Sequence, residues 1–223
     1  MTASTMTALI ADGAVDAPVI VLLHGRGSDE RDLFPLGREL HAEATIVSIR
    51  APFEAAPWGY GPGWAWYRFL GGTTPEPDSF AAGQAALEGY LQELPDRLGR
   101  AIPTGSLVLG GFSQGGTTAL AQLLRRPGTA AAVMVFSGFL ATHPTVEATP
   151  ERVGSTPIWW GHGTADGAIP FESAELGWAD LGAAGAQLTA VRYSGMGHSI
   201  SLPELADARG WLAALEVPST RRR

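Results

Sequence analysis

The chain has 223 residues, of which 45% are hydrophobic, and its 15 Lys and Arg against 22 Asp and Glu give a net charge of −7. This balance argues against a nucleic-acid partner, because a phosphate backbone calls for clustered Lys and Arg, and the only basic cluster is the C-terminal run 221–223. Since the chain has no cysteine, disulfides, thiolate nucleophiles and thiolate metal sites are excluded.

The N-terminal sequence does not resemble a secretory signal, because it lacks a basic region followed by an apolar core. The longest apolar runs, such as Val19–Leu23, are far shorter than the ~20 residues that cross a bilayer. We therefore expect a soluble, cytoplasmic protein without a membrane span. An apolar surface patch could support a homodimer.

Short aliphatic runs alternate along the chain with segments of helical spacing. The predicted strands are 7–11, 19–23, 45–49, 107–109, 133–136, 158–160 and 188–193, and helices are predicted over 80–98, 117–125, 171–181 and 202–215. Most of the strands are almost continuously apolar, which is typical of parallel strands covered on both faces. The alternation predicts an α/β fold, with one mostly parallel sheet and helices on both faces.

Two connections between these elements are unusually long and could face a functional site. The first, 52–78, is rich in aromatic residues, and we predict that Trp64, Trp66 and Tyr67 form an apolar wall for a substrate. The alternative is that these side chains pack over the sheet as core. The second connection, 138–155, begins directly after a strand, so Phe139 and Leu140 are predicted to contact the substrate as well.

Residues 107–116 contain three aliphatic residues that lead into a Gly-x-Ser-x-Gly pattern, followed by a predicted helix. This order of strand, tight turn and helix is the context in which a serine becomes a nucleophile, here Ser113. Gly111 and Gly115 would allow close backbone approach where a Cβ would clash. The alternative is a glycine-rich turn that only packs, or that binds an anion at the helix N-terminus.

A serine nucleophile needs a base and a group that orients the base. His198 follows the last predicted strand and Asp166 follows the preceding one, so both should lie at the same edge of the sheet as Ser113. Asp166 could instead cap the helix near Pro170, and His198 could be an exposed loop residue. We expect His162 to order its own loop.

Stabilising an oxyanion requires N–H groups directed at the reacting carbonyl oxygen. We predict that the backbone N–H of Gln114, next to the serine, is one donor. The glycine-rich segment 23–29 should supply the other, from the backbone N–H of Arg26. His24 is interpreted as a structural residue of that segment.

Four motifs occur in order: Leu-His-Gly-x-Gly at 23–27, Gly-Phe-Ser-Gln-Gly-Gly at 111–116, His-Gly-x-x-Asp-x-x-Ile-Pro at 162–170 and Gly-Met-Gly-His at 195–198. Together they resemble the phospholipase/carboxylesterase family of small α/β-hydrolases, which includes acyl-protein thioesterases and bacterial carboxylesterases. The resemblance covers nearly the whole chain. It implies an α/β-hydrolase fold without a large cap domain. We expect residues 1–217 to form this single domain and 218–223 to be a disordered basic tail.

The resemblance also implies a serine hydrolase that needs no cofactor or metal, with Ser113, Asp166 and His198 as its catalytic triad. Its substrates would be small to medium carboxylic esters, thioesters or lysophospholipids, and Met196 of the last motif would contact them. Two alternatives stay open. One is an amidase or peptidase on the same fold, and the other is a non-catalytic protein that binds a small apolar ligand.

The side chain of Arg26 stands where many members of this family carry leucine. If it faces the cleft, we expect it to favour substrates that carry a carboxylate or phosphate near the scissile bond. The alternative is a solvent-facing arginine paired with Asp29 or Glu30.

Overall fold

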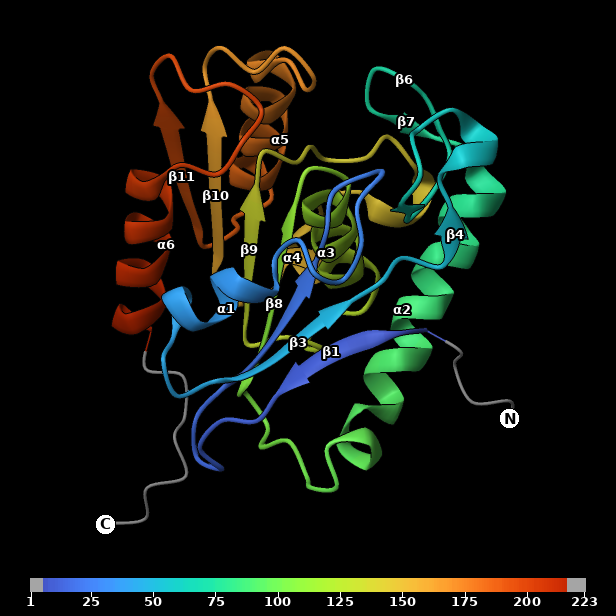
Figure 1. Cartoon of the computed structure of the whole chain (residues 1–223). Coiled ribbons are helices and arrows are strands. Elements are labelled where there is room, and N and C mark those ends of the chain that lie inside the picture. Colours follow the sequence, from blue (N-terminus) through green and yellow to red (C-terminus); the bar gives the residue numbers. More distant parts are fainter. Residues whose placement is uncertain (1–5, 216–223) are drawn as a thin grey trace.

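The computed structural model describes residues 6–215, which form a seven-stranded sheet with helices on both faces (Figure 1). The strand order is β1-β3-β2-β8-β9-β10-β11, in which β1 is antiparallel to β3 and every other neighbouring pair is parallel. The strands are β1 (Ala8–Ala11), β2 (Val19–Leu23), β3 (Thr45–Ile49), β8 (Leu107–Phe112), β9 (Ala132–Phe136), β10 (Ile158–Gly163) and β11 (Leu188–Tyr193).

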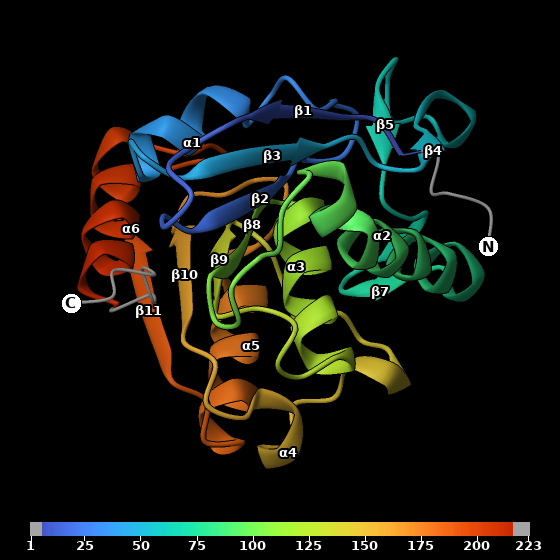
Figure 2. The same cartoon turned by 90° about the horizontal axis from the view of Figure 1, so that it is seen from below.

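The helices divide between the two faces of the sheet, as Figure 2 shows. One face is covered by α1 (Phe34–Leu40) and α6 (Leu202–Ala214), and the other by α2 (Pro77–Arg97), α3 (Gln114–Arg125), α4 (Pro150–Val153) and α5 (Phe171–Ala183). The predicted fold class is thus confirmed, and the described residues contain no cap domain. The predicted tail, 218–223, lies outside the described residues.

Two apolar clusters hold the helices against the sheet, one on each face. Strand β2 contributes to both, because successive side chains of a strand point to opposite faces. Its Val19, Val21 and Leu23 pack in the cluster under α2, α3 and α5, whereas Ile20 and Leu22 pack in the cluster under α1 and α6. Burial on both faces explains why this strand is apolar at every position.

The long connection after β3 contains structure that its composition did not predict. It forms two small antiparallel pairs, β4 (Phe53–Glu54) with β5 (Trp64–Ala65) and β6 (Phe69–Gly71) with β7 (Thr74–Pro75), and the 3-10 helix η1 (Ala56–Trp58). Helix α1 was also missed, because seven residues that include Pro35 and Gly37 carry little helical signal.

A buried carboxyl group, that of Glu204, lies in the first turn of α6 and completes a capping box with Ser201. Its backbone N–H donates to Ser201 Oγ at 3.2 Å, and its Oε2 accepts the Ser201 N–H at 3.3 Å. Its Oε1 lies beside Gly161 without a hydrogen-bond partner in the part of the chain described. Burial raises the pKa of Glu204 to about 8.

We predict that Glu204→Gln stabilises the protein at alkaline pH. Because the folded pKa lies above the unfolded value, Glu204 contributes stability below pH ~4.5 that is lost as the pH rises through about 8. Glutamine preserves the capping box without the charge. The free energy of unfolding, measured by urea denaturation, should exceed that of the wild type by ~1–3 kcal/mol at pH 9, with a smaller difference at pH 5. Glu172→Gln, in the exposed first turn of α5, is the matched control, and equal pH profiles for Glu204→Gln and wild type would contradict the prediction.

Candidate active site

Ser113 occupies a strained turn between β8 and α3, with φ 54° and ψ −119°. A residue other than glycine in such a conformation costs ~1–3 kcal/mol, so the surroundings must hold it in place. The Ser113 N–H donates to the carbonyl of Phe136 at 2.8 Å. A Cβ on Gly115 would collide with the carbonyl of Leu23, and one on Gly111 would collide with the backbone of Gly115. The turn therefore presents Ser113 at the carboxyl end of the parallel strands.

His198 and Asp166 come from the loops after β11 and β10 and reach the same edge of the sheet. The Nε2 of His198 lies 2.9 Å from Ser113 Oγ, and its Nδ1 lies 2.7 Å from Asp166 Oδ2. Since an ionised carboxylate can only accept, this contact favours the tautomer in which Nδ1 carries the hydrogen and Nε2 is free to accept one. The imidazole also packs against the ring of Phe112, with centroids 4.7 Å apart.

Asp166 is held from two sides. Its Oδ1 accepts the backbone N–H groups of Ala168 and Ile169, each at 2.8 Å, and its side chain is fully buried. These bonds form a turn within the loop. The alternative role, a cap of the helix near Pro170, is not seen, because α5 has no side-chain cap, and the other oxygen of Asp166 faces His198. The same carboxylate thus organises its loop and contacts the imidazole.

Two further histidines shape the loops around this site. His162 is buried, its Nε2 lies 3.0 Å from the carbonyl of Ile169 and 3.4 Å from Asp166 Oδ2, and burial lowers its pKa. His24 is also buried, its Nε2 accepts the Ala51 N–H at 3.0 Å, and burial lowers its pKa as well. No hydrogen bond joins either histidine to Ser113 in the described residues. His24 supports the site through backbone contacts, whereas His162 contacts both the Ile169 carbonyl and the Asp166 carboxylate.

The backbone N–H groups of Arg26 and Gln114 have no hydrogen-bond partner within residues 6–215, and both residues line the same cavity as Ser113. The Gln114 side chain is anchored instead to the long connection. Its Oε1 accepts the Trp66 N–H and its Nε2 donates to the Tyr67 carbonyl, each at 2.8 Å. These bonds hold the connection against the start of α3.

The cavity over Ser113 has a volume of about 170 Å³. Its walls combine the serine and histidine with four aromatic rings and few other polar groups; the lining residues are Gly25, Arg26, Tyr67, Phe69, Phe112, Ser113, Gln114, Phe139, Ala168, Ile169 and His198. Sequence reasoning missed Phe69, Phe112 and Ile169. Phe112 is the variable residue of the Gly-x-Ser-x-Gly pattern and Ile169 follows Asp166 by three positions, so proximity to the motifs could have indicated them.

The residues expected to contact the substrate fall into two groups. Tyr67 and Phe139 line the cavity, whereas Trp64, Trp66 and Met196 do not. Trp66 is fully buried, and its indole N–H donates to the His24 carbonyl at 2.9 Å, which corresponds to the core alternative.

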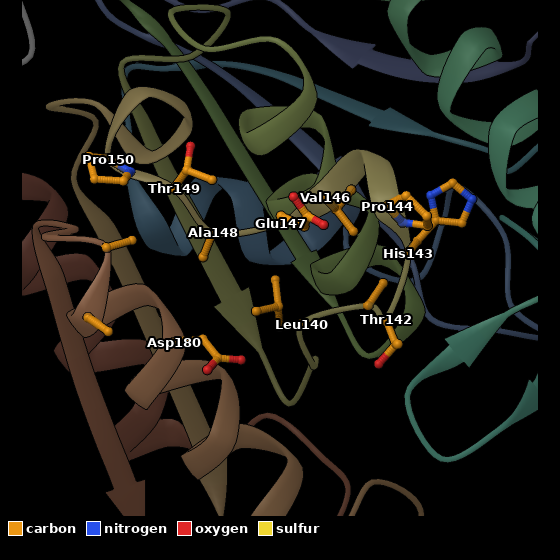
Figure 3. A pocket seen from close by; sticks show the side chains of 13 residues that line it. Leu140, Thr142, His143, Pro144, Val146, Glu147, Ala148, Thr149, Pro150 and Asp180 are labelled. Carbon is orange, nitrogen blue, oxygen red and sulfur yellow. The ribbon is translucent and has the colours of Figure 1, made fainter.

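The other two side chains and Leu140 lie elsewhere. Trp64 stacks against the guanidinium of Arg50, whose Cζ lies 4.9 Å from the centroid of the Trp64 ring. Met196 is half-buried, and its carbonyl accepts the Ala165 N–H at 3.0 Å. Leu140 lines a second cavity of about 790 Å³ between the segment 140–150 and α5 (Figure 3).

Within residues 6–215, no helix is long and apolar enough to cross a bilayer. The same residues contain no group of three or more His, Asp or Glu that could hold a metal ion. The expected cytoplasmic location, the homodimer and the lack of a nucleic-acid partner stay predictions.

Comparisons with known proteins agree with this architecture. An acyl-protein thioesterase 1 from Debaryomyces hansenii is 30% identical over 214 residues, which cover 86% of this chain and 89% of that protein. A probable carboxylesterase from rice, Os04g0669500, is 35% identical over 143 residues, which cover 62% of this chain and only 52% of that relative. The crystal structure of esterase PE8 superposes with a TM-score of 0.77 at 25% identity, covering 94% of this chain and 99% of the other.

A family model described as Phospholipase/Carboxylesterase matches residues 5–216. The chain therefore belongs to the phospholipase/carboxylesterase family of α/β-hydrolases, and it is a hydrolase of carboxylic esters.

Proposed function

We propose that Ser113, His198 and Asp166 are the catalytic triad of a serine esterase for small carboxylic esters. The observation that carries this proposal is the unbroken chain of contacts from Asp166 Oδ2 through the imidazole to Ser113 Oγ, with distances of 2.7 and 2.9 Å. A serine hydroxyl becomes an effective nucleophile when a base within this reach takes its proton and a third group orients the base.

Each group then has one role in the reaction. Ser113 Oγ attacks the acyl carbon while His198 Nε2 takes its proton, and the imidazolium returns that proton to the leaving alcohol. Asp166 holds the Nδ1–H tautomer and stabilises the imidazolium without taking the proton. Water, activated by the same imidazole, then hydrolyses the acyl-enzyme and releases the acid.

The unpartnered N–H groups of Arg26 and Gln114 are proposed to bind the oxyanion of both tetrahedral intermediates. Neither group has another partner in the described residues, and both lie at the cavity that contains Ser113. Such donors gain strength in a site from which water is excluded, and each is typically worth ~3–4 kcal/mol of barrier.

The size of the cavity favours a short acyl group. Its volume of about 170 Å³ is below the ~300–1,000 Å³ of ordinary ligand pockets. We therefore propose short-chain esters, or thioesters with an equally short acyl group, rather than lysophospholipids. The rings of Phe139 and Phe69, 5.9 Å apart, form part of the wall that limits the length.

Loss of the serine nucleophile should abolish hydrolysis. We expect Ser113→Ala to lower kcat/KM for p-nitrophenyl acetate by about a thousandfold or more, and to prevent labelling by a fluorophosphonate probe. The control is Ser199→Ala, because Ser199 is an exposed serine next to His198 and outside the cavity. A wild-type protein that is folded but neither labelled nor active on any activated ester would support the non-catalytic alternative.

Enlarging the cavity should change the preferred acyl length. Phe139→Ala removes a ring from the wall, so we expect the ratio of kcat/KM for p-nitrophenyl octanoate to that for the acetate to rise about tenfold. Leu140→Ala is the matched control, since this neighbouring side chain lines the second cavity and should leave the ratio unchanged. An unaltered ratio in Phe139→Ala would contradict the proposed wall.

Hydrolysis of the corresponding p-nitroanilides, tested beside the esters, would reveal an amidase.

A further inference from the structure

We infer that the side chain of Arg26 is an anion-binding subsite of the esterase, and that the enzyme prefers esters with a carboxylate or phosphate close to the scissile bond. This inference rests on the proposed function of Ser113, because the subsite matters only if an ester is bound there. Arg26 is exposed and lines the cavity that also contains Ser113 and His198.

The carboxylates nearest in sequence are bound to other arginines. Asp29 Oδ2 accepts a hydrogen bond from Arg31 Nη1 at 2.9 Å. The carboxylate of Glu30 accepts hydrogen bonds from Arg50 Nε and Nη2, at 2.6 and 2.7 Å. Within residues 6–215, no ion pair or hydrogen bond engages the guanidinium of Arg26. The pairing with Asp29 or Glu30 that the alternative requires is therefore absent from the described residues, although Arg26 is exposed.

Aromatic rings hold the guanidinium in position. Its central carbon lies 4.5 Å from the centroid of the Tyr60 ring and 5.9 Å from that of Phe69. Tyr60 is itself fixed, since its hydroxyl accepts the Phe69 N–H at 2.7 Å. Stacking engages the face of a guanidinium and leaves its N–H donors at the edge, where a carboxylate or phosphate binds through two parallel hydrogen bonds.

The electrostatic surroundings favour an anion at this point. None of the described residues that line the cavity is acidic, and Arg26 is the only one that always carries a positive charge. The side chain of Asp166 is fully buried behind His198. The net charge of −7 opposes an anion at long range, but at physiological ionic strength charges beyond ~8 Å are largely screened, so the local guanidinium dominates.

The test compares esters that differ only in charge. Three acetyl esters place a carboxylate, a phosphate or a neutral amide on the leaving group: 3-acetoxybenzoate, 3-acetoxyphenyl phosphate and 3-acetoxybenzamide. A second pair, the monophenyl esters of adipic acid and of its half-amide, places the charge on the acyl side. The measured quantity is the ratio of kcat/KM for each anionic ester to that of its amide partner, at 50 and 500 mM NaCl.

We expect at least one of these ratios to fall tenfold or more in Arg26→Leu at low salt, mainly through KM, because a charge-assisted bidentate contact is lost. High salt should reduce the wild-type preference. Arg26→Lys, which retains charge without the planar fork, should keep part of it. The ester whose ratio falls shows whether the subsite binds a carboxylate or a phosphate. It also shows whether the bound anion belongs to the acyl group or to the leaving alcohol.

Arg31→Leu is the matched control. It also changes the net charge from −7 to −8 and lies in the same segment, but Arg31 is exposed, pairs with Asp29 and does not line the cavity. Its ratios should equal those of the wild type. Equal effects of Arg26→Leu on charged and neutral esters, or equal effects of the two leucine variants, would overturn the inference.

A binding measurement separates this inference from the proposed reaction. Calorimetry with the Ser113→Ala variant should give about tenfold tighter binding of 3-hydroxybenzoate or 3-hydroxyphenyl phosphate than of 3-hydroxybenzamide, and Arg26→Leu in that background should remove the difference. A folded wild-type protein that hydrolyses no ester, together with this binding selectivity, would contradict the triad alone. Full ester hydrolysis without any preference for the anions would contradict the subsite alone.

Discussion

The backbone turn at Ser113 is the constraint on which the rest of the site depends. Its φ of 54° is unfavourable for a serine, and it persists because β8, α3 and β2 meet so closely that only glycines fit at positions 111 and 115. The apolar clusters on both faces of the sheet supply the packing that holds these elements together. The packing of the whole domain core thus holds the Ser113 hydroxyl at the cavity.

The loops after β10 and β11 are held to the same edge by polar contacts in addition to packing, such as that of His198 against Phe112. The two oxygens of Asp166 have different partners: Oδ1 accepts two backbone N–H groups, and Oδ2 faces His198. The buried His162 adds a contact to the Ile169 carbonyl. Because the carboxylate is already held in place, it orients the imidazole without reorganising during the reaction, which is the condition for electrostatic preorganisation.

The sequence allowed much of the fold to be predicted, because local patterns report local structure. Strand β2 is apolar at every position since both of its faces are buried, and α3 follows a glycine pattern with few structural alternatives. The positions of Ser113, Asp166 and His198 after their respective strands also placed them at one edge, given that parallel strands end together. Helix α1 escaped because seven residues with a proline and a glycine carry no clear period.

What the sequence determined by itself was therefore the family, the parallel sheet and the residues able to carry the chemistry, all of which follow from motifs and short-range periodicity. Only the tertiary structure decided which aromatic residues meet the cavity and that Arg26, at the cavity, has no carboxylate partner among the described residues. Trp66 is core and Phe69 is wall, and Glu30 pairs with Arg50 rather than Arg26. These choices depend on side-chain direction and on contacts between residues far apart in the chain, which composition and spacing do not encode.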